Sequence, residues 1–224
     1  MSRKKVAGII IALVVSFAVL GQCQMMGGRR GSRPPQMLGT FNPVVGAGAA
    51  YQMVMKDRTT TFAYAIVGKE DVEGSTGYWM EIRTSGPDAP GETVMKQLMV
   101  LGGDKPQVKR MIMQSAGRPP MEMPTGMMNM QQRGGAGQAG DSEPGVKVGS
   151  ESVTVPAGTF DCDHYRKQTQ GGPVDVWVST KVSPYGTVKM TSGEMTMVLE
   201  KVLSNEASHI QGEPQKLPFG MPQS

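Results

Sequence analysis

The chain of 224 residues is poor in the residue types that carry most enzyme chemistry. It has two cysteines, two histidines and only 5% aromatic residues. Two cysteines are too few for a disulfide scaffold, and no nucleophile-elbow pattern or Gly-rich phosphate loop occurs. No segment of the body has a sustained 3.6-residue apolar period, which argues against a helical bundle. The sequence therefore indicates a fold class and a cellular location but no reaction.

Excess positive charge is confined to the N-terminal end. The whole chain has a formal charge of +4 at pH 7, but residues 1–33 contain six basic residues and no acidic one. The remaining residues contain 17 basic and 19 acidic groups, so the body of the protein is slightly acidic. This distribution argues against nucleic acid as a partner, because binding it requires a basic surface on the folded domain.

The N-terminus has the features of an export signal. Residues 2–5 are positively charged, and residues 6–21 form an uninterrupted run of 16 apolar and small residues. Such a run is shorter than the about 20 residues of a membrane-spanning helix. We expect residues 1–22 to be a cleaved signal peptide rather than a permanent anchor. This predicts a location in the bacterial periplasm or cell envelope.

Cys23 follows the signal directly. Residues 20–23 (LGQC) resemble a bacterial lipobox, although Gln22 stands where a small residue normally precedes the cysteine. Lipidation of Cys23, which would tether the protein to a membrane as a lipoprotein, and ordinary cleavage near Ala18 or Gly21 are both open alternatives. Residues 23–43 are rich in Gly, Arg and Pro, which predicts a flexible arm.

From about residue 44, short apolar runs alternate with turn-forming residues, which predicts a mainly β fold. The expected strands, about ten in number, are residues 50–55, 60–67, 78–83, 94–101, 108–113, 146–155, 160–168, 174–178, 186–191 and 195–203. Most connections have hairpin length, so neighbouring strands should pair in order. Because a sheet of this size twists and curls, we predict a single curved antiparallel sheet, a half-barrel, over residues 44–204.

Alternation predicts the two faces of this sheet. In residues 78–83 it places Tyr78, Met80 and Ile82 on an apolar face and the residues between them on a mixed, solvated face. Two segments have no such pattern. Residues 115–145 are a low-complexity insertion of Met, Gly, Pro and Gln, and residues 205–224 are a polar, Pro-rich tail. We expect both to be disordered.

Two hairpin motifs near the C-terminal end resemble a known pattern. They comprise residues 151–162 (ESVTVPAGTFDC), 174–179 (VDVWVS) and 183–190 (SPYGTVKM). The pattern is similar to one that recurs in exported bacterial families of unknown function. In those families the hairpins belong to a curved sheet like that of the lipoprotein-carrier (LolA/LolB-like) fold. The resemblance implies the same curved sheet and no catalytic residue.

Residues 161–164 (DCDH) are the one cluster of metal-ligand residue types. On a strand, Cys162 and His164 would share one face and Asp161 and Asp163 the other. We expect Cys162 to be buried in the core and His164 to pair at the surface, because a metal ion would need two further ligands from elsewhere. A hydrolase acting through Asp161, Asp163 and His164 is a weaker alternative. We predict no enzymatic activity and no cofactor.

Methionine is present in excess, with 20 residues. On strands these flexible side chains should line the concave face of the sheet and bind an apolar small molecule, a lipid or a protein segment. The candidate ligand-binding residues are Met53, Met55, Met80, Met195 and Met197. The predicted function is therefore a non-enzymatic binding module of the envelope.

Methionines of the insertion suggest an alternative function. They include Met121, Met123, Met127, Met128 and Met130. Thioether sulfur is a soft ligand, so a cluster of methionines in an exported protein could capture Cu(I). On this alternative the chain is a Met-rich copper-binding envelope protein.

Overall fold

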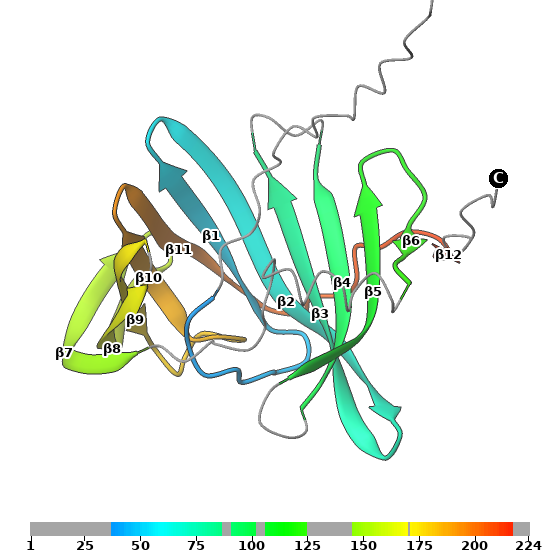
Figure 1. The fold of residues 1–224 in the computed structure, drawn as a ribbon, viewed down its shortest axis with the longest axis horizontal. Helices are drawn as coiled ribbons and strands as arrows, with labels where there is room; N and C mark the ends of the chain where they lie inside the picture. Colours follow the sequence, from blue (N-terminus) through cyan, green and yellow to red (C-terminus); the bar gives the residue numbers. More distant parts are fainter. Residues whose placement is uncertain (1–36, 87–90, 102–105, 125–144, 170, 217–224) are drawn as a thin grey trace, which may run out of the picture. The chain divides into compact units, whose positions relative to one another are not determined.

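The computed structural model describes residues 37–86, 91–101, 106–124, 145–169 and 171–216. These residues form one 12-stranded sheet and contain no helix (Figure 1). The first six strands are β1 (Gly48–Met55), β2 (Arg58–Val72), β3 (Ser75–Ser85), β4 (Thr93–Val100), β5 (Gln107–Ser115) and β6 (Met121–Glu122). The other six are β7 (Val146–Val155), β8 (Gly158–Thr169), β9 (Gly172–Val178), β10 (Thr187–Ser192), β11 (Met195–Leu203) and β12 (Gln215–Lys216).

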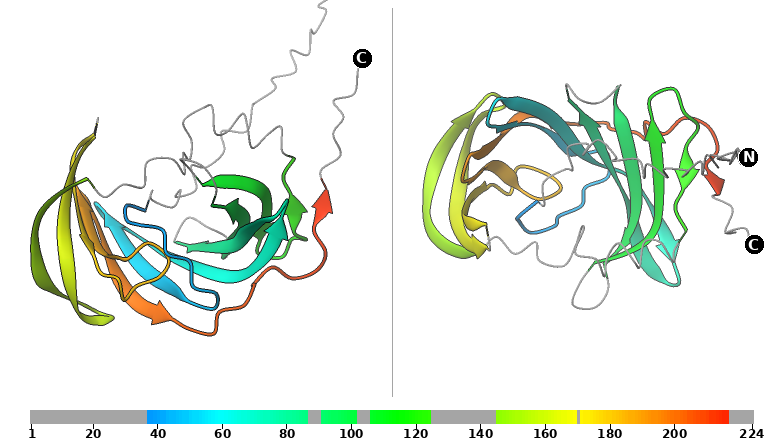
Figure 2. Two further views of the ribbon diagram at one scale, coloured as in Figure 1. Left: turned by 90° about the horizontal axis from the view of Figure 1, so that it is seen from below. Right: turned by 45° about the horizontal axis from the view of Figure 1, so that its top comes forward.

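Two meanders of neighbouring strands make up the sheet, whose strand order is β12-β6-β5-β4-β3-β2-β1-β11-β10-β9-β8-β7. β1 pairs antiparallel with both β2 and β11 and so joins the meanders. Every pairing is antiparallel except that of β12 with β6, which is parallel. The sheet is curved and open rather than closed into a barrel (Figure 2). The predicted fold class is confirmed, and the two-residue strands β6 and β12 are additional to the expected ones.

The β2–β3 hairpin is longer than the sequence predicted. The expected strands end at residue 67 and resume at residue 78, but residues 68–77 continue the two strands as far as the pair Val72 and Ser75. The turn itself is Glu73-Gly74, and both residues have positive φ, 54° and 81°. This is the conformation of a two-residue type I′ turn, whose twist matches that of the flanking strands.

The two faces of the sheet follow the predicted alternation. We call the concave face the inner face and the convex face the outer face. The inner face carries most of the main core, including Tyr51, Phe62, Met80, Met197 and Leu199. A smaller cluster on the outer face contains Trp79, Leu98 and Ile112. The expected separation of Tyr78, Met80 and Ile82 from the residues between them is confirmed.

Two segments lie over the middle of the inner face. Residues 37–43 run beside the connection between β9 and β10, residues 179–186, and Figure 2 shows both within the curve of the sheet. Met37 and Leu38 are buried, the Asn42 N–H donates to the Pro184 carbonyl, and the Thr187 hydroxyl donates to the Leu38 carbonyl. Residues 37–43 therefore belong to the core rather than to a flexible arm, which corrects the sequence prediction.

The expected disordered tail also differs from the structure. Residues 205–216, which we call the C-terminal strap, run along the outer side of the sheet to its edge (Figure 2). There the Gln215 N–H donates to the Pro120 carbonyl, and β12 pairs with β6. The strap is held because polar groups on the outer face of β3 and β5 bind its side chains and backbone. Residues 217–224 lie outside the described residues.

The predicted insertion is partly ordered as well. Residues 115–124 contain the end of β5 and all of β6, whereas residues 125–144 lie outside the described part. The predicted signal peptide, Cys23 and residues 24–36 of the arm also lie outside it. Within the residues that the structure describes, there is no helix with the length and apolarity to cross a membrane.

Candidate functional site

The predicted binding methionines divide into two groups. Met53, Met80 and Met197 are on the inner face, but they are 6%, 2% and 0% exposed. They pack within the core and have no surface to offer a ligand. Met55, the last residue of β1, is 47% exposed. It lies directly opposite the partly buried Met195, the first residue of β11. The five residues therefore do not form one accessible surface.

Tyr185, in the connection between β9 and β10, packs over the middle of the inner face. Its hydroxyl donates to the Met80 sulfur at 3.5 Å, and its ring contacts those of Phe41 and Tyr64. The Tyr51 hydroxyl donates to the Thr187 carbonyl at 2.9 Å, which ties β1 to the start of β10. Burial raises the pKa of Tyr51, Tyr64 and Tyr185, so the three phenols stay neutral. The chain itself thus occupies the place predicted for a ligand.

An accessible methionine surface lies farther along the inner face, on β4, β5 and β6. We call it the methionine patch, and its members are Met95, Met111, Met113, Met121 and Met123. Met95 is directly opposite Met113, and Met113 is directly opposite Met121. The next row pairs Met111 with Met123 through the Met123 N–H and the Met111 carbonyl. The patch thus spans three neighbouring strands, which Figure 1 shows side by side.

The methionine patch is continuous with the core at one end and exposed at the other. Met95 lies opposite Ile82 of β3 and packs against the main core. Met113 and Met121 are each 37% exposed. Sequence reasoning missed Met95, because a single alternating run does not reveal the register in which neighbouring strands pair. Among the methionines of the copper alternative, Met121 and Met123 are in the patch, while Met127, Met128 and Met130 lie outside the described residues.

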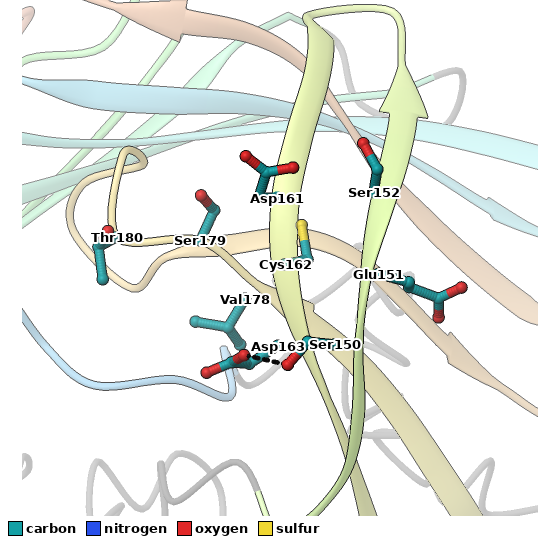
Figure 3. A pocket seen from close by; sticks show the side chains of 9 residues that line it. All are labelled: Ser150, Glu151, Ser152, Asp161, Cys162, Asp163, Val178, Ser179 and Thr180. Atoms are coloured by element: carbon teal, nitrogen blue, oxygen red, sulfur yellow. Dashed lines mark hydrogen bonds between the residues drawn. The ribbon is translucent and has the colours of Figure 1, made fainter.

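Three residues of the DCDH cluster, Asp161, Cys162 and Asp163, line a separate, open pocket of about 440 Å³, whereas His164 is not part of its lining (Figure 3). Cys162 is 2% exposed, as predicted, and its thiol donates to the Phe160 carbonyl. Burial, together with the negative charges of Asp161, Asp163 and Glu151, raises the pKa of this thiol to about 11. A thiol that stays protonated is a poor nucleophile and a poor metal ligand.

Asp163 and His164 do not face each other. Asp163 binds Lys147 at 2.7 Å and the Ser150 hydroxyl at 2.8 Å, and the bond to Lys147 is the larger cause of its lowered pKa. His164 faces the other side of β8, where it stacks on Trp177 and binds Asp175 at 2.7 Å. The prediction that His164 pairs at the surface is confirmed. The residues of the hydrolase alternative are therefore not assembled on one face.

A polar cluster on the outer face joins the C-terminal strap to the sheet. Glu81, in the centre of β3, is 1% exposed. Its carboxylate accepts bonds from the Ser208 hydroxyl, the His209 backbone N–H and the His209 ring at 2.9–3.1 Å. Arg83 donates to His209 Nε2 at 2.7 Å and to Glu206 at 2.9 Å. Sequence reasoning missed this cluster, for which the only signal was an acidic residue among the apolar residues of β3.

No protein-family model matches the chain, and no curated protein matches it. Two crystal structures resemble it at low identity. A "putative lipoprotein" from Parabacteroides distasonis is 11% identical, with a TM-score of 0.39, and the match covers 75% of this chain and 100% of that one. A "putative exported protein with YmcC-like fold" from Bacteroides fragilis is 13% identical, with a TM-score of 0.34, and the match covers 74% and 99%.

These similarities are too low to carry a conclusion about ligand, activity or location, because one fold hosts many functions. The resemblance of the hairpin motifs to the lipoprotein-carrier fold accordingly stays a prediction.

Proposed function

We propose that this protein is a non-enzymatic binding module of the bacterial envelope, and that the methionine patch holds the acyl chain of a lipid. The observation that carries the proposal is the row Ile82, Met95, Met113, Met121, which leads from the buried core to the exposed edge of the inner face. The export signal predicted at the N-terminus supports the location, where lipids are abundant.

The dimensions and chemistry of the row suit an extended apolar chain. Four adjacent strands span about 14 Å, because neighbouring strands lie about 4.8 Å apart. Each methylene buried against such a surface contributes about 0.8 kcal/mol. Methionine is unbranched and polarizable, so it adapts to ligands of varied shape. The charged neighbours Lys96, Arg110 and Glu122 are on the outer face, which leaves the row apolar.

The arrangement of polar residues supports a role other than catalysis. In the described part of the chain, Asp163 and His164 lie on opposite faces of β8, and the Cys162 thiol is held protonated. The polar cluster at Glu81 is filled by the strap's own side chains. Neither set offers a nucleophile beside a free base.

Binding of the fluorescent fatty acid cis-parinaric acid to the purified full-length chain tests the proposal. Saturable binding is expected, and Met113→Asp and Met121→Asp should each weaken it at least tenfold, because a carboxylate in the row has no partner. Met55→Asp is the matched control, since Met55 is exposed on the inner face but outside the patch. Absence of saturable binding, or equal loss with Met55→Asp, would overturn the proposal. Binding of an apolar peptide in place of the fatty acid would overturn its lipid part.

A further inference from the structure

The methionine patch has a property that an apolar ligand does not use, which is the placement of three thioether side chains directly opposite one another on neighbouring strands. We infer that Met95, Met113 and Met121 form a thioether site for Cu(I). The site is made of residues on the sheet and needs none of the methionines at positions 127, 128 and 130. Cu(I) binding at this site does not require lipid binding, although both ligands would use the same row, because it depends on the sulfur atoms and not on the apolar surface.

Strand register brings the three thioethers together. Met113 of β5 is the direct antiparallel partner of Met95 in β4 and of Met121 in β6. All three side chains therefore leave the same face in one row across the strands. Directly opposite residues have Cβ atoms about 4.5–5.5 Å apart. The three rotatable bonds of each methionine allow the sulfur atoms to turn toward one ion above Met113.

These sulfur atoms are also available. Within the described residues, the sulfurs of Met80 and Met99 accept hydrogen bonds from Tyr185 and Gln97, and both side chains are buried. No such bond from a described residue reaches Met95, Met113 or Met121. Since Met113 and Met121 are each 37% exposed, an ion can reach the row from solvent.

Ligand chemistry selects the metal. Three thioethers are soft and uncharged, so they favour Cu(I) over hard or borderline divalent ions such as Ca²⁺ and Zn²⁺. The nearest carboxylate on the same strand as Met121 is that of Glu122, which is on the outer face and is bound to Arg110 at 2.8 Å. Among the residues that the structure describes, no carboxylate lies in this row, so no negative charge would attract a divalent ion to it. Met111 and Met123 form the adjacent row of the same face.

The test is a competition titration of the full-length chain with Cu(I) held by a colorimetric chelator, with Ag(I) as a redox-inert second probe. One ion per chain is expected to bind. A variant with Met95, Met113 and Met121 all changed to Leu should weaken binding at least tenfold, because leucine keeps the apolar volume but removes the sulfur. Zn²⁺ should not compete. Methyl NMR signals of these three methionines should shift when Ag(I) binds.

Two controls separate this site from the alternatives. Changing Met55 and Met195 to Leu removes another directly opposed methionine pair and should leave Cu(I) binding unchanged. Changing Met127, Met128 and Met130 to Leu should also leave it unchanged. Loss of binding in either control, or full binding by the patch variant, would overturn the inference. The patch variant should still bind cis-parinaric acid, so failure of the copper site and failure of lipid binding are distinguishable.

Discussion

At the residue scale, one buried carboxylate explains why the C-terminal strap is ordered. Glu81 is almost fully buried, and an ionised carboxylate in such a place is tolerated only when it is paired and hydrogen-bonded. Ser208 and His209 provide that pairing from the far end of the chain. The Arg83 donation to Nε2 fits a His209 ring that carries its proton on Nδ1 and donates it to Glu81.

Replacing His209 by Ala should therefore destabilise the protein. The change removes the ring donor and leaves the buried Glu81 carboxylate with fewer bonds, which should lower the free energy of unfolding by about 1–3 kcal/mol. Urea unfolding measures the difference. Glu213→Gln is the matched control, because Glu213 is on the same strap and exposed. If His209→Ala changes stability no more than this control does, Glu81 does not depend on His209.

Single residues also show where the sequence was informative. The alternation of residues 78–83 predicted correctly that Met80 and Ile82 face the main core. It predicted a solvated face for the residues between them, yet Glu81 and Trp79 are buried. The alternation describes only the strand itself, whereas these two residues are covered by tertiary contacts with distant segments. For the same reason, the sequence did not predict that Met53 and Met197 are buried within the core.

At the element scale, long strands were predictable and short ones were not. Each run of alternating residues marks one of the long strands. β6 and β12 have two residues each, too few for any period, and they form because the strap runs along the sheet edge. The strap was assigned to a disordered tail on its polar, Pro-rich composition. The composition of the strap does not show that a distant strand such as β3 has side chains that accept hydrogen bonds from the strap and donate hydrogen bonds to it.

Deletion of the strap tests its structural role. A chain that ends at Ser204 should lose about 3–5 kcal/mol of stability, because a buried charge without its partners is costly. The smaller outer cluster would lose its contact with Ile210, so Trp79 fluorescence should shift toward that of solvated tryptophan. A chain that ends at Lys216 is the control and should behave like the full-length protein. Equal stability of the two truncated chains would contradict the role assigned to the strap.

At the scale of the whole molecule, one part of the inner face is covered by segments of the chain itself and another part is accessible. Residues 37–43 and the β9–β10 connection fill the middle of the inner face, where the sequence placed the ligand. The methionine patch on β4–β6 remains accessible. A methionine-lined surface on the inner face could thus be predicted from composition and strand period. Its position could not, because it depends on which parts of the face the chain covers with its own loops.

The most direct test of this account is methyl NMR of the full-length chain labelled on the methionine methyl groups and titrated with a saturated fatty acid. The signals of Met113 and Met121 should shift in a saturable manner, because the acyl chain packs against these two side chains. The signals of Met55 and Met195, on the central strands β1 and β11, should not move. Shifts confined to Met55 and Met195, or no shift at saturating ligand, would contradict the central claim.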